Sequence, residues 1–134
     1  MTVVLTTDVT FGDCDPAGIV FYPNVFRWLD AAFHKLLRPL GGHHGICKEL
    51  GSAGLGLVDA QAHFRSAIRD GDVLDVSVSI AEWSRRSVTL VYEGRVGTRL
   101  AFEAREVRCL FIRENGGIVA GDISALRDKL EKTK

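Results

Sequence analysis

The sequence has 134 residues, of which 46% are hydrophobic and 25% are charged, as in an ordinary soluble globular protein. This length predicts a single domain, residues 1–134, with enough chain to enclose a hydrophobic core. The 17 Lys and Arg residues balance the 17 Asp and Glu residues, so the chain as a whole has no attraction for nucleic acid or for an anionic membrane.

The first half of the chain predicts one strand followed by helices. Residues 3–9 are rich in Val, Leu and Thr, which favours a strand, and residues 11–23 have the Pro, Gly and Asp content of a structured loop. Asn24 is a suitable N-cap for a long helix that Pro39 ends, and a short second helix follows at residues 44–50. The long helix carries apolar residues at helical spacing: Val25, Trp28, Leu29, Ala32, Phe33, Leu36 and Leu37.

The second half predicts β structure, because from Leu55 onward apolar and polar residues tend to alternate with a period of two. We expect an antiparallel meander of four strands, a short extension and a terminal helix, at residues 55–64, 74–80, 88–96, 100–112, 118–120 and 124–131. Together with the first strand, these elements predict an α+β fold in which a five-stranded antiparallel sheet is wrapped around the long central helix.

Two carboxylates lie in the loop before the long helix, within the run Gly-Asp-Cys-Asp-Pro-Ala-Gly-Ile-Val at residues 12–20. Asp and Pro are favoured in turns, so the run by itself is typical of a rigid loop. We expect Asp13 to bind loop amides. Cys14 stands between the two carboxylates, where a thiolate is disfavoured, so we interpret it as buried filler rather than a nucleophile.

This run resembles that of the 4-hydroxybenzoyl-CoA thioesterase family, whose members have the hotdog fold. The matching residues continue through Tyr22-Pro23-Asn24 to residues 27–32. A second match is Glu82-Trp83-Ser84-Arg85-Arg86-Ser87, and a weaker third match is residues 105–108. The three matches occur in order along the whole chain, and together they imply a small hotdog-fold acyl-CoA thioesterase.

The resemblance implies that Asp15, directly before Pro-Ala-Gly, is the catalytic carboxylate, and that backbone N–H groups near Tyr22 bind the thioester oxygen. The first N–H groups of a helix lack internal partners and carry partial positive charge, so they polarise a carbonyl placed there. Asp15 would then act either as the nucleophile or as the general base for a water. The residues leave both roles open, and the resemblance favours the nucleophile.

The resemblance also implies how the substrate is bound. The turn at Ser84, Arg85 and Arg86 would contact the coenzyme A phosphates, although two adjacent arginines in a turn are often simply solvated. Asp30 has two interpretations: an i,i+3 ion pair with Arg27, or a contact with a ring hydroxyl at the far end of the acyl pocket. Enzymes of the family carry a polar residue near the position of Leu55, whereas Leu55 is apolar, which argues against the second interpretation and against specificity for a 4-hydroxyl group.

Three alternatives remain at this point. The acyl group is either aromatic, of the hydroxybenzoyl or benzoyl kind, or short and aliphatic, on coenzyme A or on an acyl carrier protein. A non-catalytic module that binds acyl-CoA is the alternative from another class, and the presence of Asp15 argues against it, because binding alone needs no such carboxylate.

The expected partners and location follow from the same features. The family assembles as homodimers, commonly paired into homotetramers, with active sites between chains, whereas no nucleic acid, membrane or metal partner is expected. Coenzyme A enters as part of the substrate, so no separate cofactor is expected. Cys14, Cys47 and Cys109 are far apart and no signal peptide precedes them, which favours the reducing cytoplasm.

Overall fold

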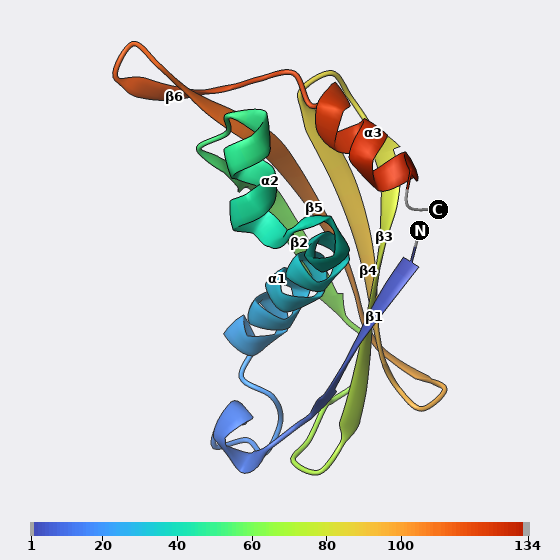
Figure 1. The fold of residues 1–134 in the computed structure, drawn as a ribbon. Helices are drawn as coiled ribbons and strands as arrows, with labels where there is room; N and C mark the ends of the chain where they lie inside the picture. Colours follow the sequence, from blue (N-terminus) through green and yellow to red (C-terminus); the bar gives the residue numbers. More distant parts are fainter. Residues whose placement is uncertain (1, 133–134) are drawn as a thin grey trace.

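The computed structural model describes residues 2–132 and contains every predicted helix and strand, with bounds shifted by a few residues (Figure 1). Two 3-10 turns, Phe11–Asp13 and Arg38–Leu40, flank the long helix. The elements are β1 (Thr2–Asp8), α1 (Pro23–Leu37), α2 (Gly42–Leu50), β2 (Gly54–Phe64), β3 (Val73–Trp83), β4 (Ser87–Val96), β5 (Arg99–Glu114), β6 (Gly117–Ala120) and α3 (Ser124–Lys132). Within residues 2–132, no helix is long and apolar enough to cross a membrane.

The five long strands form the predicted antiparallel sheet, in the order β1-β3-β4-β5-β2, and β6 extends it by pairing with β5. The predicted four-strand meander is wrong in one respect, because β2 pairs with β5 and not with β3. Residues 65–72 carry the chain across the sheet from β2 to β3. Alternating hydrophobicity fixes which face of a strand is buried, but it does not identify the neighbouring strand.

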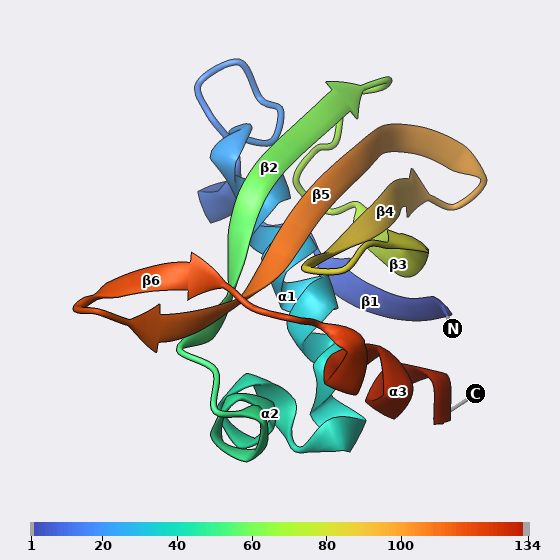
Figure 2. The same cartoon turned by 90° about the horizontal axis from the view of Figure 1, so that it is seen from above.

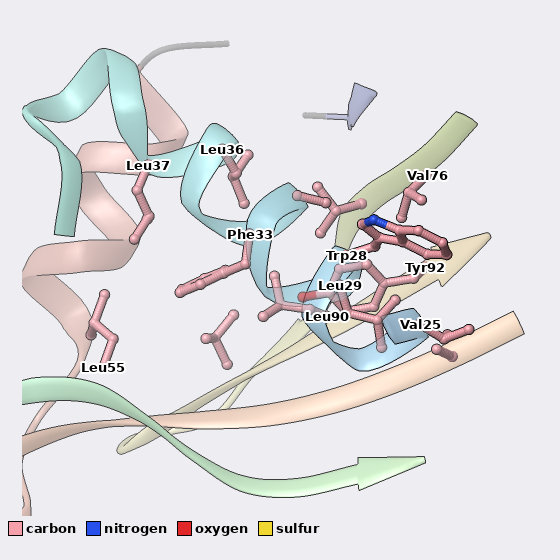
Figure 3. Close-up of a cluster of buried hydrophobic side chains, with 14 of the residues drawn as sticks. Val25, Trp28, Leu29, Phe33, Leu36, Leu37, Leu55, Val76, Leu90 and Tyr92 are labelled. Carbon is pink, nitrogen blue, oxygen red and sulfur yellow. The ribbon is translucent and has the colours of Figure 1, made fainter. Parts of the chain in front are cut away.

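The sheet curls around α1, which lies on its concave face and packs against β1 and β3 (Figures 1 and 2). Figure 2 shows the two edge strands, β1 and β2, on opposite sides of this helix. The apolar residues predicted for the helix are all buried, and Figure 3 shows several of them packed among Leu55, Val76 and Leu90 of the sheet. Each buried Val, Leu or Phe side chain among them contributes about 1.5–3 kcal/mol to folding.

The start of α1 differs from the prediction in its first residues. Tyr22 is the N-cap, Pro23 opens the helix, and Asn24 lies in the first turn rather than at the cap. Proline suits the first helical position because its fixed φ is already helical and its missing N–H needs no partner. The side-chain amide of Asn24 instead donates to the backbone carbonyl of Asp13 at 2.8 Å, which ties the preceding loop to the helix.

Candidate active site

Asp15 is the first residue of a tight turn. The backbone N–H of Gly18 donates to the carbonyl of Asp15 at 2.9 Å, and the N–H of Ala17 donates to its side-chain Oδ1 at 2.9 Å. Asp, Pro and Gly occupy the turn positions that suit them, and Gly18 has the positive φ of +82° that favours glycine. The chain then returns on itself, so that the N–H of Asp15 meets the carbonyl of Ile19 at 2.9 Å.

This turn fixes the Asp15 carboxylate with one oxygen engaged and the other available. Oδ1 accepts the Ala17 N–H, whereas no donor among residues 2–132 lies within hydrogen-bond distance of Oδ2. Asp15 is partly exposed and lines a pocket of about 470 Å³. Apolar residues Ile19, Val20 and Val25 line the same pocket.

Tyr22 lines this pocket as well, and its backbone N–H has no acceptor in the described part of the chain. Its neighbours offer no equivalent donor. Pro23 has no N–H, the N–H of Asn24 donates to Phe21, and the N–H of Val25 donates to the carbonyl of Tyr22. One pocket is therefore lined by a residue with a free backbone N–H at the positive end of α1 and by a carboxylate with a free oxygen, a combination that can bind and attack a carbonyl group.

Asp13 holds the loop together, as predicted. Its Oδ2 accepts the Thr10 N–H at 2.9 Å and the Thr10 hydroxyl at 3.1 Å, and its Oδ1 lies 3.2 Å from the Arg27 guanidinium. Its backbone carbonyl accepts the N–H of Phe21 at 2.9 Å. Cys14 packs against the hydrophobic core, and its thiol lies 3.6 Å from the carbonyl of Thr10. These contacts brace the Asp15 turn against the start of α1.

The opposite wall of the pocket was not predicted from the sequence. It consists of residues 64–68, which begin at the last residue of β2, and the N–H of Val20 donates to the carbonyl of Ile68 at 2.8 Å. Nearly fifty residues separate the two walls along the chain. The only local signal was the apolar Ile68 within a polar turn region, and that signal does not say what Ile68 packs against.

Asp30 lies elsewhere, and the first of its two interpretations, an ion pair with Arg27, is wrong. Arg27 pairs with Asp13, whereas the Oδ1 of Asp30 lies 3.1 Å from the Arg108 guanidinium and 3.4 Å from the Nε2 of His34. Asp30 does not line the pocket that contains Asp15. Leu55 is 3% exposed and belongs to the hydrophobic core, so its side chain does not face an open site.

The turn at Ser84, Arg85 and Arg86 joins β3 to β4, at the other end of β3 from the segment that borders the Asp15 pocket (Figure 1). Ser84 and Arg85 line a second hollow, of about 320 Å³, together with Arg127 of α3. Arg86 lies in the same turn but does not line this hollow. In one chain, the structure therefore brings Asp15 and Tyr22 together and leaves the basic turn and Asp30 apart from them.

A buried polar network on the concave face of the sheet is a second feature that the sequence analysis missed. Tyr92, Glu106 and Arg108 are 2%, 2% and 6% exposed, and the Tyr92 hydroxyl donates to Glu106 at 2.5 Å. A signal was present, because Glu106 and Arg108 occupy the period-two positions that elsewhere in this strand are apolar. Figure 3 shows Tyr92 among the core side chains between α1 and the sheet.

The surroundings of this network shift two pKa values. Burial, followed by the adjacent Glu106 carboxylate, raises the pKa of the Tyr92 hydroxyl far above its ordinary value, so the phenol stays protonated and donates. Burial, followed by the nearby His34 and Arg108, lowers the pKa of His43. The neutral Nε2 of His43 accepts the N–H of Leu55 at 3.0 Å. In the described chain, no group of three or more His, Cys, Asp or Glu side chains could hold a metal ion.

Comparison with known proteins identifies the family of this chain. Residues 9–130 match the thioesterase-like superfamily. The chain belongs to this family. The match begins before the Asp15 loop and ends within α3, so the pocket, the central helix and strands β2 to β6 lie inside it. The resemblance in the loop and the hotdog fold expected from it are thereby confirmed.

Several members of the superfamily are similar in sequence or structure. The 4-hydroxybenzoyl-CoA thioesterase of Pseudomonas sp. strain CBS-3 is 38% identical over 88 residues, which are 64% of this chain and 62% of that enzyme. Its solved structure matches with a TM-score of 0.85 and 31% identity over 96% of this chain and 98% of that one. A solved gentisyl-coenzyme A thioesterase matches with a TM-score of 0.80 and 29% identity, over 93% of this chain and 99% of that one.

A 1,4-dihydroxy-2-naphthoyl-CoA hydrolase of Prochlorococcus marinus is 30% identical over 81 residues, which are 57% of this chain and 54% of that enzyme. The sequence alignments thus span between half and two thirds of these two curated relatives, whereas the structural matches span nearly the whole of the solved chains. All three similar proteins are named for hydrolysis of an aromatic acyl-CoA thioester.

Proposed function

We propose that this chain is an acyl-CoA thioesterase that hydrolyses an aromatic acyl-CoA, with a hydroxybenzoyl- or benzoyl-like acyl group, to the free acid and coenzyme A. The observation that carries the proposal is that Asp15 and Tyr22 line one pocket, and that one carboxylate oxygen of Asp15 and the backbone N–H of Tyr22 have no hydrogen-bond partner among residues 2–132. The family and the aromatic substrates named for its similar members support the substrate class.

The Tyr22 N–H would donate to the thioester carbonyl oxygen and stabilise the negative charge that develops there. Such a donor, held rigidly at the positive end of a helix, is worth about 2.7–4 kcal/mol in the transition state. Because Pro23 cannot donate and the next two N–H groups are occupied, this role falls to Tyr22 within the helix start.

Asp15 has two possible roles in the chemical step. As a nucleophile, its carboxylate oxygen attacks the thioester carbon, coenzyme A leaves as the thiolate, and water then cleaves the mixed anhydride. As a general base, Asp15 takes a proton from a water whose oxygen attacks the same carbon, and the thiolate leaves with a proton. A single turnover in heavy-oxygen water separates the two, because only a nucleophilic Asp15 acquires the label.

The lining of the pocket supports an aromatic acyl group. Ile19, Val20, Val25 and Phe64 supply apolar contacts, and the volume of about 470 Å³ is in the range of small-molecule sites. A substituted benzoyl ring is flat and largely apolar, so it gains from burial against these side chains. The same lining would also accept a short aliphatic acyl group, which keeps that alternative for the experiment to decide.

Recognition of coenzyme A would use Ser84, Arg85 and Arg86. Arginine guanidinium groups suit phosphate, and this turn would supply the local positive charge that a chain of zero net charge lacks overall. β3 has 11 residues, so its length places the turn on the order of 35 Å from the loop that borders the Asp15 pocket. The turn would therefore serve a pocket formed with another chain of an oligomer.

The open edge of the sheet supports a homodimer, or two dimers in a homotetramer. β2 is an edge strand, and Leu57, Val58 and Phe64 on it are 50%, 56% and 55% exposed. An unpaired apolar edge favours pairing with a second copy. Phe64 also lines the Asp15 pocket, so a partner at this edge would border the site. The three cysteines are free, which supports the cytoplasm as the compartment.

The experiment that tests the proposal is the release of free thiol from a panel of acyl-CoA thioesters, with aromatic and short aliphatic acyl groups. We expect the purified protein to hydrolyse the aromatic members faster, and Asp15→Asn to lower kcat by about 100- to 10,000-fold. Asp8→Asn, an exposed carboxylate on β1, is the matched control and should retain the activity of the unchanged protein.

Three outcomes would count against parts of the proposal. Binding without thiol release from any member of the panel would favour a non-catalytic module. Faster hydrolysis of the aliphatic members, or of acyl carrier protein thioesters, would favour the second substrate class. An active protein that is monomeric by light scattering would contradict the oligomer and the role given to the basic turn.

A further inference from the structure

The crossover segment, residues 65–72, carries the chain from β2 to β3 with no helix or strand of its own, and its first four residues line the Asp15 pocket. At its start, two backbone N–H groups donate to the carbonyl of Ala101, at 2.8 and 3.1 Å. The next two N–H groups, of Ala67 and Ile68, have no acceptor among residues 2–132. Backbone bonds therefore leave part of this wall of the pocket to be held by side chains.

One side chain, that of Arg99 at the start of β5, supplies most of that support. Its Nη1 donates to the Oγ of Ser66 at 2.8 Å and to the carbonyl of Ala67 at 2.6 Å, and its Nη2 lies 3.5 Å from the Oδ2 of Asp72. The Oγ of Ser66 in turn donates to the carbonyl of Leu100 at 2.8 Å. One guanidinium thus holds two residues that line the pocket and the far end of the crossover segment.

The contacts of Arg99 fix a position more than they stabilise the fold. The side chain is 42% exposed, and an exposed ion pair such as the one with Asp72 contributes little to the free energy of unfolding. A planar guanidinium with several acceptors, however, sets the directions in which those acceptors lie. Because Ser66 and Ala67 belong to the wall of the pocket, the loss of Arg99 should move or loosen that wall.

We propose that Arg99 is a positioning residue that sets the width of the acyl pocket by clamping the crossover segment. This inference rests on the proposed thioesterase function and deepens it, because it assigns acyl-group selectivity to a side chain that does not line the pocket. A flat aromatic ring gains from burial against apolar walls on both sides, whereas a two-carbon chain buries little area on either. A displaced wall therefore weakens binding of the aromatic group more than that of the aliphatic group.

The test measures KM and kcat for benzoyl-CoA and acetyl-CoA. Arg99→Gln should raise KM for benzoyl-CoA by about tenfold, the factor of one hydrogen bond to a charged group, and raise KM for acetyl-CoA much less. The kcat for benzoyl-CoA should stay within about twofold, because Arg99 contacts neither Asp15 nor Tyr22 and the change affects binding rather than chemistry. A thioester that is bound but not hydrolysed is measured as a competitive inhibitor, so that its inhibition constant replaces KM.

Arg95→Gln is the matched control. Arg95 lies in the same hairpin of β4 and β5, its side chain is also 42% exposed, it pairs with Glu93, and it donates to the carbonyl of Thr98 at 3.1 Å. It has no hydrogen bond or ion pair to the crossover segment. This variant should leave both KM values unchanged, which separates the clamp from the general loss of an exposed arginine.

A double-mutant cycle identifies the residue through which Arg99 acts. Ser66→Ala removes one acceptor of the guanidinium, so it should raise KM for benzoyl-CoA in the same direction, and the double variant should lose no more than Arg99→Gln alone. Arg99→Lys keeps the charge but cannot contact all three acceptors, so its KM should lie between those of Arg99→Gln and the unchanged protein. Should Arg99→Gln fail to fold by circular dichroism, Ser66→Ala and Arg99→Lys replace it.

The proposal is overturned if a folded Arg99→Gln, or the two variants that replace it, leaves KM for benzoyl-CoA unchanged, raises both KM values by the same factor, or lowers kcat instead. It is also overturned if Arg95→Gln has the same effect as Arg99→Gln, or if the losses in the double variant add. Failure of the proposed function looks different, because the unchanged protein would then release no thiol from either thioester.

Discussion

Asp15 lies in the loop before α1, Asp30 lies within α1, and the two carboxylates are held in different ways. Asp15 is fixed by backbone groups within four residues of itself, in a turn that its own side chain helps to close. Asp30 is fixed by Arg108, which lies 78 residues further along the chain and is itself held by Glu106 and Leu55.

This difference predicts how much the stability of the protein depends on the contacts of each carboxylate. The Asp15 loop depends on local hydrogen bonds that are partly exposed, so the loss of one of them should cost little and leave the rest of the fold intact. The network behind Asp30 is buried and coupled, so the loss of one member should leave another buried polar group unpaired and lower the stability of the whole molecule.

The largest expected effect is a loss of stability when the buried network behind Asp30 is broken. Glu106→Ala leaves the Arg108 guanidinium in the core without its buried partner, and we expect a loss of about 3–5 kcal/mol in the free energy of unfolding. Urea unfolding followed by circular dichroism measures it. Glu103→Ala on the same strand removes only an exposed pair with Arg65 and should cost about 0–1 kcal/mol. Equal losses in the two variants would contradict the account of the network.

The next effect compares two tyrosines. Tyr92→Phe removes a hydroxyl that donates to the buried Glu106, and we expect it to lower the free energy of unfolding by about 1–3 kcal/mol. Tyr22→Phe is the counterpart at the exposed site, where the residue is 61% exposed and its hydroxyl has no partner in the described chain. Its unfolding free energy should stay within about 0.5 kcal/mol of the unchanged protein. A Tyr22→Phe that is the more destabilised of the two would reverse the comparison.

A smaller effect is expected in the Asp15 loop. Asp13→Ala removes the carboxylate that accepts from Thr10 and pairs with Arg27, and this loss of a cap should cost about 1 kcal/mol in thermal or urea unfolding. Asp70→Ala, an exposed carboxylate with no hydrogen-bond or ion-pair partner among residues 2–132, serves as the control and should be neutral. A loss as large as that of Glu106→Ala would show that the loop is coupled to the core after all.

The smallest expected effect is on the pH dependence of stability. The folded protein lowers the pKa of His43 below its ordinary value of 6.5, so the unfolded chain binds a proton there more readily. The contribution of His43 to the free energy of unfolding is complete above about pH 6.5, and it is lost as pH falls through the lower pKa of the folded state. Thermal melting points between pH 5 and 8 measure it. His43→Gln, which can still accept the Leu55 N–H, should flatten this dependence, whereas His63→Gln on the exposed face of β2 should not.

The sequence by itself determined what depends on near neighbours. The period-two and helical patterns predicted each strand and helix, and the Asp-Pro-Ala-Gly order predicted the Asp15 turn, because turn geometry follows from the φ preferences of adjacent residues. The resemblance in the same run identified the family. The N-cap was missed by two residues because Pro23 opens the helix and Asn24 uses its side chain for the loop.

Only the tertiary structure decided which distant residues meet. An alternating pattern says that β2 has an inward face, but not that its neighbour is β5, so the wall of the pocket at residues 64–68 could not be predicted. The same reason applies to Asp30: its spacing along the helix suggested Arg27, whereas Asp13 binds that side chain and Arg108 reaches Asp30 from across the core. Spacing along a helix or strand fixes which face of that element a side chain occupies. The distant residue that the side chain contacts is fixed by how the sheet curls around the helix.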